Sequence, residues 1–186
     1  MSSQKNLEEA RVRMGKAIEA LKGEFAKLRT GRASPNLLDH VVVDCYGSSM
    51  PLNQIASLSI PESRTIVITP WDKSTLSEID KAIKKSDLGL NPINDGKVVR
   101  IGLPSPTEER RKELVKQAKK MAEEGRVAVR NVRREANEVA KKLQKDGKIS
   151  EDELRKGEVE IQKLTDQFTG QVDQLLTHKE KEIMEI

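Results

Sequence analysis

Apolar residues near the N-terminus recur in steps of three, four and seven positions. They are Leu7, Met14, Ile18, Leu21, Phe25 and Leu28. This spacing puts them on one face of an α-helix, with polar residues on the other faces. Thr30 and Gly31 end the pattern, and a glycine is common just beyond a helix C-terminus. The pattern predicts a helix over residues 4–29.

After this helix the apolar residues alternate with polar ones, which is typical of β-strands. The strand candidates are 40–45, 56–60, 65–69 and 98–103. A short amphipathic helix, 76–85, is predicted between the last two. Ser74 or Thr75, together with Glu78, could cap it. We therefore predict a compact α+β module over residues 30–106.

A long helix is predicted to begin at Thr107, because Pro104 and Pro106 fix the approach of the chain and Thr107 can cap it. Glu108 and Glu109 suit the positive end of the helix dipole. The apolar seam that follows consists of Leu114, Ala118, Met121, Gly125, Ala128, Val132, Ala136, Val139 and Leu143. A helix over 107–145 would be roughly 58 Å long at 1.5 Å per residue, longer than an ordinary small globule needs.

Ser150 and Glu153 form a capping box that predicts the start of a third helix. Its seam consists of Leu154, Ile161, Leu164, Phe168, Val172, Leu175 and Ile183. None of the three narrow apolar faces can be buried by its own helix, so we predict that the helices pack as an elongated three-helix bundle.

The predicted fold class is therefore α+β, with a small α/β, β-rich domain inserted between helices one and two of the bundle. Residues 1–29 and 107–186 form the bundle, and 30–106 form the inserted domain. Two connections, 30–35 and 103–107, join them, and a double connection permits a hinge. The hinge candidates are Thr30, Gly31, Pro104, Ser105 and Pro106.

The composition excludes several classes of protein. The chain has 186 residues, of which 35% are hydrophobic and 2% aromatic, so its core must be mostly aliphatic. No apolar run approaches the roughly 18 residues of a membrane span, and Glu8 and Glu9 do not fit a signal peptide. The single cysteine, Cys45, suits a reducing cytosol, and we expect a cytoplasmic protein without membrane association.

Catalytic and metal-binding patterns are also missing. One cysteine and two widely separated histidines offer no metal-ligand cluster. Cys45 and His40 fall on opposite faces of a predicted strand and cannot pair as nucleophile and base. No nucleotide-binding or hydrolytic motif is present. We expect no enzymatic activity, no metal and no cofactor.

The net charge of +4 is unevenly distributed. Residues 107–149 carry 14 basic and 8 acidic side chains, whereas 150–186 carry 5 and 10. Six basic residues of the long helix are spaced so that they share one face: Lys112, Lys116, Lys119, Arg126, Arg130 and Arg133. The pattern predicts that this face looks away from the apolar seam, with Glu123 as the one interruption and few acidic partners.

This basic face has two interpretations. It can be an ordinary solvated helix face, but the concentration of charge favours a site for RNA or another polyanion. Arginine adds to the case because its planar fork suits phosphate. Phe25 and Phe168 lie on core seams and only Tyr46 and Trp71 remain, so platforms for stacking single-stranded bases are missing. The expected partner is folded RNA, recognised by its shape and phosphates.

Four motifs are similar to those of bacterial ribosome recycling factors, and the resemblance covers essentially the whole chain. The motifs are RTGRASP at 29–35, SDLGLNP at 86–92, TEERRK at 107–112 after Pro104, and RVAVRNVRR at 126–134. Gly125, just before the last motif, departs from the family's pattern. The resemblance implies an L-shaped molecule whose two domains mimic a transfer RNA in size.

The resemblance also implies a function. A protein of this family enters the vacated A site of the post-termination ribosome and contacts large-subunit ribosomal RNA. Elongation factor G then hydrolyses GTP and drives the subunits apart. The resemblance assigns RNA contact to Arg110, Arg130 and Arg133, with Arg29 and Arg32 as weaker candidates. We expect a monomer.

The residues alone leave an alternative open, a helical adaptor or chaperone-like protein that binds a partner helix through an exposed seam. Binding that weakens steeply with salt favours RNA, whereas binding that depends on apolar residues and ignores salt favours the adaptor.

Overall fold

The computed structural model describes residues 2–185; Met1 and Ile186, which the predicted bundle includes, lie outside the described residues. The chain divides into two compact units. Unit 1 contains residues 2–29 and 108–185, and unit 2 contains residues 30–107. Each unit encloses a separate hydrophobic cluster, as expected of two domains.

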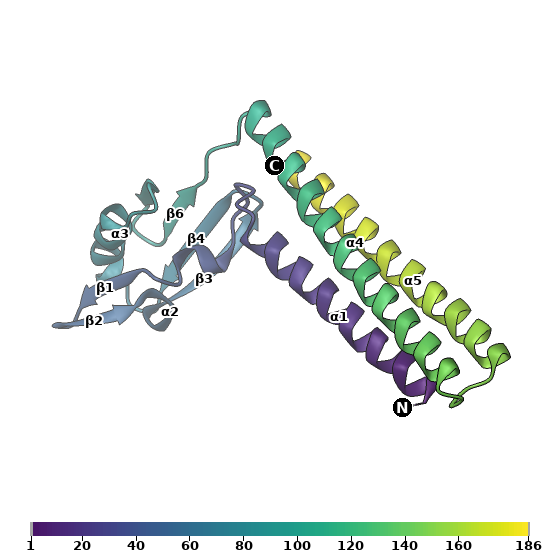
Figure 1. The fold of residues 1–186 in the computed structure, drawn as a ribbon. Coiled ribbons are helices and arrows are strands. Elements are labelled where there is room, and N and C mark those ends of the chain that lie inside the picture. The colour runs from purple at the N-terminus through teal and green to yellow at the C-terminus, as the bar shows by residue number, and fades with distance from the viewer. Residues whose placement is uncertain (1, 186) are drawn as a thin grey trace. The chain divides into compact units, whose positions relative to one another are not determined.

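Unit 1 is a bundle of three helices, α1 (Ser3–Lys27), α4 (Glu108–Lys145) and α5 (Glu151–Met184). They lie side by side, and α5 returns the chain to the end of the bundle where α4 begins (Figure 1). The predicted α+β class and its three-helix bundle are confirmed. Helix α1 ends earlier than predicted, because Leu28 already has an extended backbone.

Polar caps fix the ends of the helices. Ser2 accepts a hydrogen bond from the backbone N–H of Lys5 at the start of α1. At the start of α5, Ser150 Oγ accepts from the N–H of Glu153 at 3.1 Å, and Glu153 Oε2 accepts from the N–H of Ser150 at 2.7 Å. The backbone hydrogen bond from Ser150 is the main reason why the pKa of Glu153 is lowered. The predicted capping box is thus confirmed.

The buried face of α4 differs from the predicted seam in three places. Val129 and Ala140 are buried where the sequence indicated Ala128 and Val139. Ala122 is buried where the sequence indicated Met121, which is only half-buried. Helix α4 packs against both α1 and α5, so its buried arc is broader than a single apolar row.

One buried polar contact joins α1 to α4. Asn6 is 5% exposed, and its Nδ2 donates to the backbone carbonyl of Ala136 at 2.9 Å. A helical carbonyl has a second lone pair, so it can accept this bond without losing its place in the helix. In apolar surroundings such a bond favours one register of α1 against α4.

Unit 2 consists of two antiparallel sheets and several short helices. In chain order its elements are a 3-10 helix (Pro35–Leu38), β1 (Val42–Cys45), β2 (Ser48–Pro51), α2 (Leu52–Ile55), β3 (Ala56–Glu62), β4 (Thr65–Pro70), a 3-10 helix (Lys73–Thr75), α3 (Leu76–Lys85), β5 (Pro92–Asn94) and β6 (Val99–Gly102). Strand β1 pairs with β2, and the larger sheet has the order β3-β4-β6-β5.

The strand predictions are confirmed, but two strands were not anticipated. Strands β2 and β5 contain Pro51 and Pro92, respectively. A proline makes a strand less expected when only the sequence is known, because it has no N–H to donate. Strand β5 lies at the edge of the larger sheet, where a missing N–H donor is tolerated. Cys45 is buried in the core of unit 2.

Helix α3 buries Leu76, Ile79 and Ile83 as predicted, and Thr75, one of the two predicted caps, is at its N-cap position. The side chain of Thr75 makes no capping bond to α3. Asp72 instead begins the preceding 3-10 turn, because its Oδ1 accepts from the N–H of Ser74 at 2.9 Å. Asp72 thus caps the 3-10 turn and not α3 itself.

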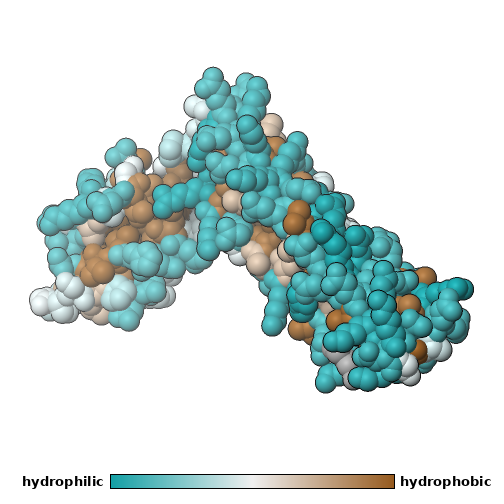
Figure 2. Space-filling view, in the orientation of Figure 1, coloured by the Kyte–Doolittle hydropathy of each residue, from teal (hydrophilic) through white to brown (hydrophobic). Residues whose placement is uncertain are grey.

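The two units differ in the surface that they present. The visible face of unit 1 is mostly hydrophilic with scattered apolar side chains, whereas unit 2 shows a more continuous apolar area (Figure 2). Within residues 2–185, no helix is both long enough and apolar enough to cross a membrane.

Gly125→Ala is expected to stabilise unit 1 by up to about 1 kcal/mol, because alanine is the better helix former. A Cβ at Gly125 would lie 3.4 Å from Leu21 Cδ2 and 3.8 Å from Val172 Cγ2, which are ordinary contacts. The measurement is urea unfolding followed by circular dichroism. Gly23→Ala in α1 is the control, because a Cβ there meets nothing within 4 Å. If Gly125→Ala lowers the stability and Gly23→Ala does not, α1 and α5 must pack too closely against α4 at Gly125 to leave room for a Cβ.

Candidate nucleic-acid interface

The six basic residues predicted to share a face all lie on α4 and are called here the cationic stripe: Lys112, Lys116, Lys119, Arg126, Arg130 and Arg133. The three lysines are exposed, and the three arginines are half-buried. Because α4 is one continuous helix packed on two others, it holds these charges on a rigid support.

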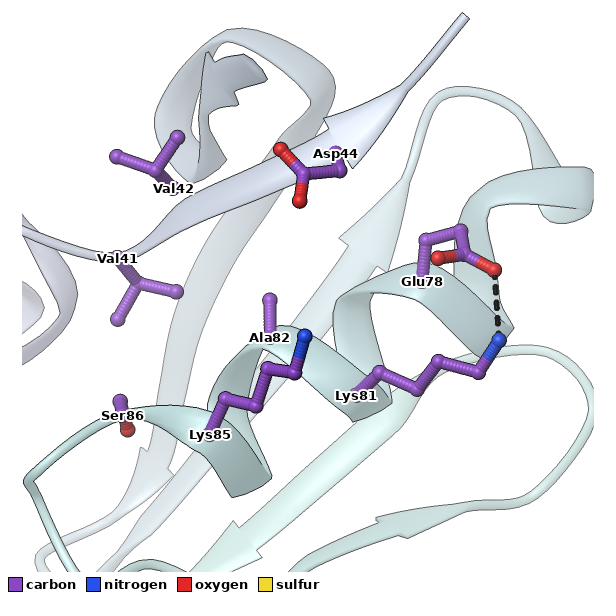
Figure 3. A pocket seen from close by; sticks show the side chains of 8 residues that line it. All are labelled: Val41, Val42, Asp44, Glu78, Lys81, Ala82, Lys85 and Ser86. Carbon is purple, nitrogen blue, oxygen red and sulfur yellow. Dashed lines mark hydrogen bonds and ion pairs between the residues drawn. The ribbon is translucent and has the colours of Figure 1, made fainter. Parts of the chain in front are cut away.

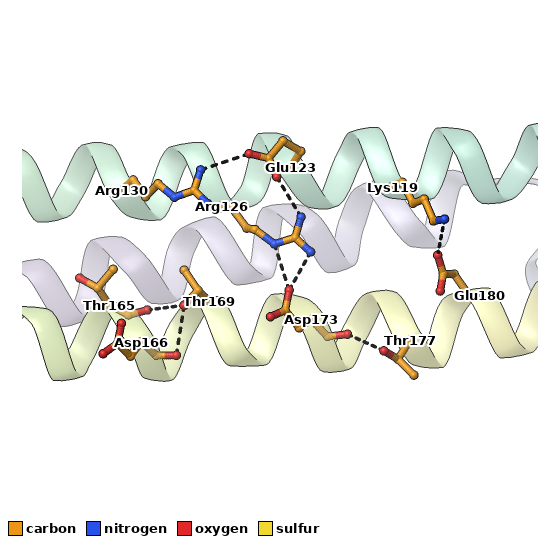
Figure 4. Close-up of polar contacts among 10 residues, drawn as sticks. All are labelled: Lys119, Glu123, Arg126, Arg130, Thr165, Asp166, Thr169, Asp173, Thr177 and Glu180. Atoms are coloured by element: carbon orange, nitrogen blue, oxygen red, sulfur yellow. Dashed lines mark hydrogen bonds and ion pairs between the residues drawn. The ribbon is translucent and has the colours of Figure 1, made fainter.

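The orientation predicted for the stripe is wrong in its arginine half, which borders α5. Arg126 Nε and Nη2 both donate to Asp173 Oδ1 of α5, at 3.0 and 2.7 Å (Figure 4). Arg133 Nη1 donates to Gln162 Oε1, also on α5, at 3.5 Å. The broad buried arc of α4 brings α5 close to these positions, which the spacing of residues within α4 alone does not reveal.

Glu123 is a partner of the stripe and not only an interruption. It accepts from Arg126 Nη1 at 2.9 Å and from Arg130 Nη1 at 3.1 Å (Figure 4). The hydrogen bond from Arg126, followed by that from Arg130, lowers the pKa of Glu123. Glu123 is therefore ionised at neutral pH and offsets part of the arginine charge.

The lysines of the stripe are held more loosely. Lys119 Nζ lies 3.7 Å from Glu180 Oε1 of α5, and Lys112 Nζ lies 3.2 Å from Glu108 Oε1. An exposed pair such as Lys112–Glu108 contributes only about 0–1 kcal/mol, so a phosphate can replace its carboxylate. The expectation of few acidic partners is thus wrong for four of the six residues, which contact Glu108, Glu123, Asp173 or Glu180.

Six cations of α4 have no carboxylate within 4.0 Å among the described residues. They are Lys116, Lys120, Arg133, Arg134, Lys142 and Lys145. Lys120 and Arg134 lie one helical turn beyond Lys116 and Arg130, so they extend the same surface. The pattern of the stripe omitted Lys120, although its step of four from Lys116 could have revealed it.

The remaining candidate RNA-binding arginines are close in sequence to the positions where the chain passes from one unit to the other. Arg110 is in the first turn of α4, and its Nη1 lies 2.7 Å from Glu113 Oε2. Arg29 belongs to unit 1 and Arg32 to unit 2, and both are exposed. Their use together with the cationic stripe stays a prediction.

The hinge candidates have defined backbone features within unit 2. Gly31 has φ +81°, a conformation that side chains with a Cβ rarely adopt. A Cβ at Gly31 would also lie 3.4 Å from Pro106 Cδ. Thr30 is buried, and Pro104 and Ser105 are exposed. Movement at this point stays a prediction.

A pocket of about 250 Å³ lies in unit 2 (Figure 3). Its lining comes from β1, α3 and their flanking residues: Val41, Val42, Asp44, Glu78, Lys81, Ala82, Lys85 and Ser86. Lys81 Nζ pairs with Glu78 Oε1 at 3.0 Å, which leaves Lys85 and Asp44 as opposite charges. The lining thus has no preference for anions. In the described part of the chain, no three His, Cys, Asp or Glu residues are placed to hold a metal.

Comparison with known proteins gives consistent matches. The model of the ribosome recycling factor family matches residues 21–184. The ribosome-recycling factor of Carboxydothermus hydrogenoformans is 58% identical over 180 residues, which cover 97% of each chain. That of Nitratidesulfovibrio vulgaris is 56% identical over the full length of both chains.

Solved structures match over the same extent. A solution structure of the ribosome recycling factor matches with a TM-score of 0.69 and 44% identity, covering 100% of this chain and 99% of the other. A second match has a TM-score of 0.62 and 51% identity, covering 98% and 99%. It comes from models of the T. thermophilus ribosome recycling factor and E. coli elongation factor G bound to the E. coli post-termination complex.

The contact between Arg126 and Asp173 is expected to contribute a coupling free energy of about 0.5–1 kcal/mol, because two N–H groups donate to a carboxylate that water still reaches. Single and double replacement of both residues by alanine, followed by urea unfolding, measures this coupling. The pair Lys119–Glu180, at 3.7 Å, should couple more weakly. If the coupling free energy between Arg126 and Asp173 is zero, Asp173 does not hold Arg126, and Arg126 is available to bind RNA.

Proposed function

The chain belongs to the ribosome recycling factor family, and on that premise we propose that it binds the post-termination ribosome and, with elongation factor G and GTP, splits it into subunits. Ribosomes, mRNA and tRNA would thereby be recycled. The observation that carries this proposal is the full-length match to ribosome recycling factors.

Large-subunit ribosomal RNA is the proposed partner of unit 1. The cationic stripe supports this assignment, since it offers guanidinium and ammonium groups along one rigid helix. Phe25 and Phe168 are buried in the bundle, so they cannot stack on unpaired bases. This favours contact with the phosphates of folded RNA over recognition of a single strand.

Within the stripe the residues differ in how freely they can contact phosphate. Arg126 is held by two carboxylates, and its side chain is 21% exposed, so we assign it mainly to the structure of the bundle. Arg130 has only Glu123, and its side chain is 43% exposed. Arg133 has a neutral amide partner, so it carries charge with no carboxylate to offset it. We propose Arg130 and Arg133 as the main RNA contacts, supported by Arg110 and the lysines.

The chemistry of GTP hydrolysis is assigned to elongation factor G, and we propose that this chain is not itself an enzyme. Its part is mechanical. Unit 1 would hold the ribosomal RNA while unit 2 moves about the connections 30–35 and 103–107. The proposed place of action is the cytoplasm, where ribosomes are found, and the proposed active form is a monomer.

Light scattering of purified post-termination ribosomes tests the proposed function. Scattering is expected to fall only when this protein, a matched elongation factor G and GTP are all present. Arg130→Ala/Arg133→Ala should slow the fall about tenfold at limiting protein, because charge-assisted hydrogen bonds to phosphate are lost.

Arg155→Ala/Lys156→Ala in α5 is the matched control, since it removes the same charge from exposed ion pairs outside the stripe. It should leave the rate unchanged. If scattering does not change with the native protein, recycling is ruled out. If both double variants slow the reaction equally, the stripe has no special role.

Glu123→Gln is expected to strengthen binding to large ribosomal subunits by roughly twofold to fivefold, because Arg126 and Arg130 lose a competing carboxylate. Sedimentation binding at two salt concentrations measures the affinity and its salt dependence. The gain should shrink as salt increases. Weaker binding of Glu123→Gln, with the helical content unchanged, would show that Glu123 holds the arginines in the position that RNA requires.

A further inference from the structure

The aromatic side chains are divided between the core of the bundle and the surface of unit 2. The chain has two phenylalanines, one tyrosine and one tryptophan. Phe25 and Phe168 are buried, whereas Tyr46 and Trp71 are 70% and 71% exposed. Burial of aromatic rings is among the largest contributions to a core. A chain with so few rings leaves two of them in solvent, so folding alone does not account for them.

Tyr46 also has an unusual backbone conformation. Its φ is +53°, and it is the one non-glycine residue with positive φ in the described chain. Tyr46 and Gly47, φ +76°, form the two-residue turn between β1 and β2. Such turns favour Asn or Gly at the first position, because a larger side chain is sterically disfavoured there. Backbone strain of this kind often accompanies a functional surface.

Hydrogen bonds bring this turn to the segment that follows β4. The hydroxyl of Tyr46 donates to Asp72 Oδ2. Asp72 Oδ1 accepts from the N–H of Ser74 at 2.9 Å, and the N–H of Trp71 donates to the carbonyl of Ile55 at 3.0 Å. The side chain of Tyr46 is therefore held against the Asp72 carboxylate, and a backbone hydrogen bond fixes Trp71, the residue that precedes Asp72 in the chain. The hydrogen bond from Tyr46 is the main reason why the pKa of Asp72 is lowered, so this carboxylate is charged at neutral pH.

The combination of aromatic rings and a carboxylate suits a cation. A guanidinium group can lie on an aromatic face and also donate hydrogen bonds to a carboxylate. An RNA strand would instead bring phosphates towards Asp72, and the neighbouring Lys73 supplies only one opposing charge. The chemistry of this surface is thus opposite to that of the cationic stripe.

We propose that Tyr46, Trp71 and Asp72 form a docking surface for a basic segment of a partner protein, with an arginine side chain as the group that it recognises. This goes beyond the proposed function, on which it rests only for the choice of the ribosome as the assembly in which the partner is sought. Unit 1 then binds RNA through cations, and unit 2 binds protein through aromatic rings and an acid.

The first test uses Trp71 as its own reporter, since it is the only tryptophan of the chain. The full-length protein is titrated with the blocked peptide Gly-Arg-Gly-Arg-Gly and with its glutamate counterpart. The arginine peptide is expected to change the tryptophan emission, and the glutamate peptide is not. Asp72→Asn should weaken the arginine response at least about threefold, because the carboxylate is lost and the shape is kept.

Glu62→Gln is the matched control, since it removes one exposed carboxylate of unit 2 outside the docking surface. It should leave the titration unchanged. Equal responses to both peptides, or an equal loss in Asp72→Asn and Glu62→Gln, would overturn the proposal. This titration contains no ribosomes, so its result does not depend on the proposed function.

The second test identifies the partner by cross-linking to ribosomes. Trp71→p-azidophenylalanine keeps an aromatic ring at the surface, and Ile93→p-azidophenylalanine is the comparison because Ile93 is 66% exposed in the same unit. Position 71 is expected to give several times the yield of position 93, in a product that resists ribonuclease and is removed by protease. Adding Asp72→Asn should lower this yield.

Products that ribonuclease removes would show an RNA contact and overturn the proposal. So would equal yields from positions 71 and 93. Sedimentation with ribosomes, measured on the same samples, reports separately whether the protein binds at all. Failure of binding would count against the proposed function, whereas binding with no preferred cross-link would count against the docking surface alone.

Discussion

The mutual burial of three aliphatic helix faces is the interaction on which the rest of unit 1 depends. Only 2% of the residues are aromatic and 34% are charged, so no helix of this chain could hide its apolar face alone. Small residues of α4, such as Ala118, Ala122 and Gly125, let α1 and α5 approach from two sides. This broad contact fixes the rotation of α4, and the rotation in turn decides which cations face solvent and which face α5.

Features set by neighbouring residues could be predicted from the sequence. The capping box of Ser150 and Glu153 needs only two residues three positions apart, and the alternation around Val43 needs only one strand. The bundle itself could be predicted because each of the three helices has an apolar face that must be buried against another helix. By contrast, the choice between Ala128 and Val129 as the buried residue depends on two neighbouring helices, and a single apolar row does not contain that information.

The parts of the candidate interface that could not be predicted depend on residues far apart in the chain. Arg126 meets Asp173 across 47 positions, and Asn6 meets the carbonyl of Ala136 across 130. A helix wheel of α4 alone counts only the acids of α4, so it overestimates the free charge of the stripe. The same holds in unit 2, where a hydrogen bond across 26 positions joins Tyr46 to Asp72.

Pairing between acids and bases also decides how the stripe can act. Bare cations at steps of three and four would repel one another and loosen α4 in the free protein, and Glu123, Glu180 and Asp173 relieve this repulsion. Because most of these pairs are exposed, each is weak enough to be exchanged for a phosphate. Binding of RNA is then partly an exchange of carboxylates for phosphates. Its free energy must be smaller than the number of cations suggests, which suits a factor that has to leave the ribosome after each round.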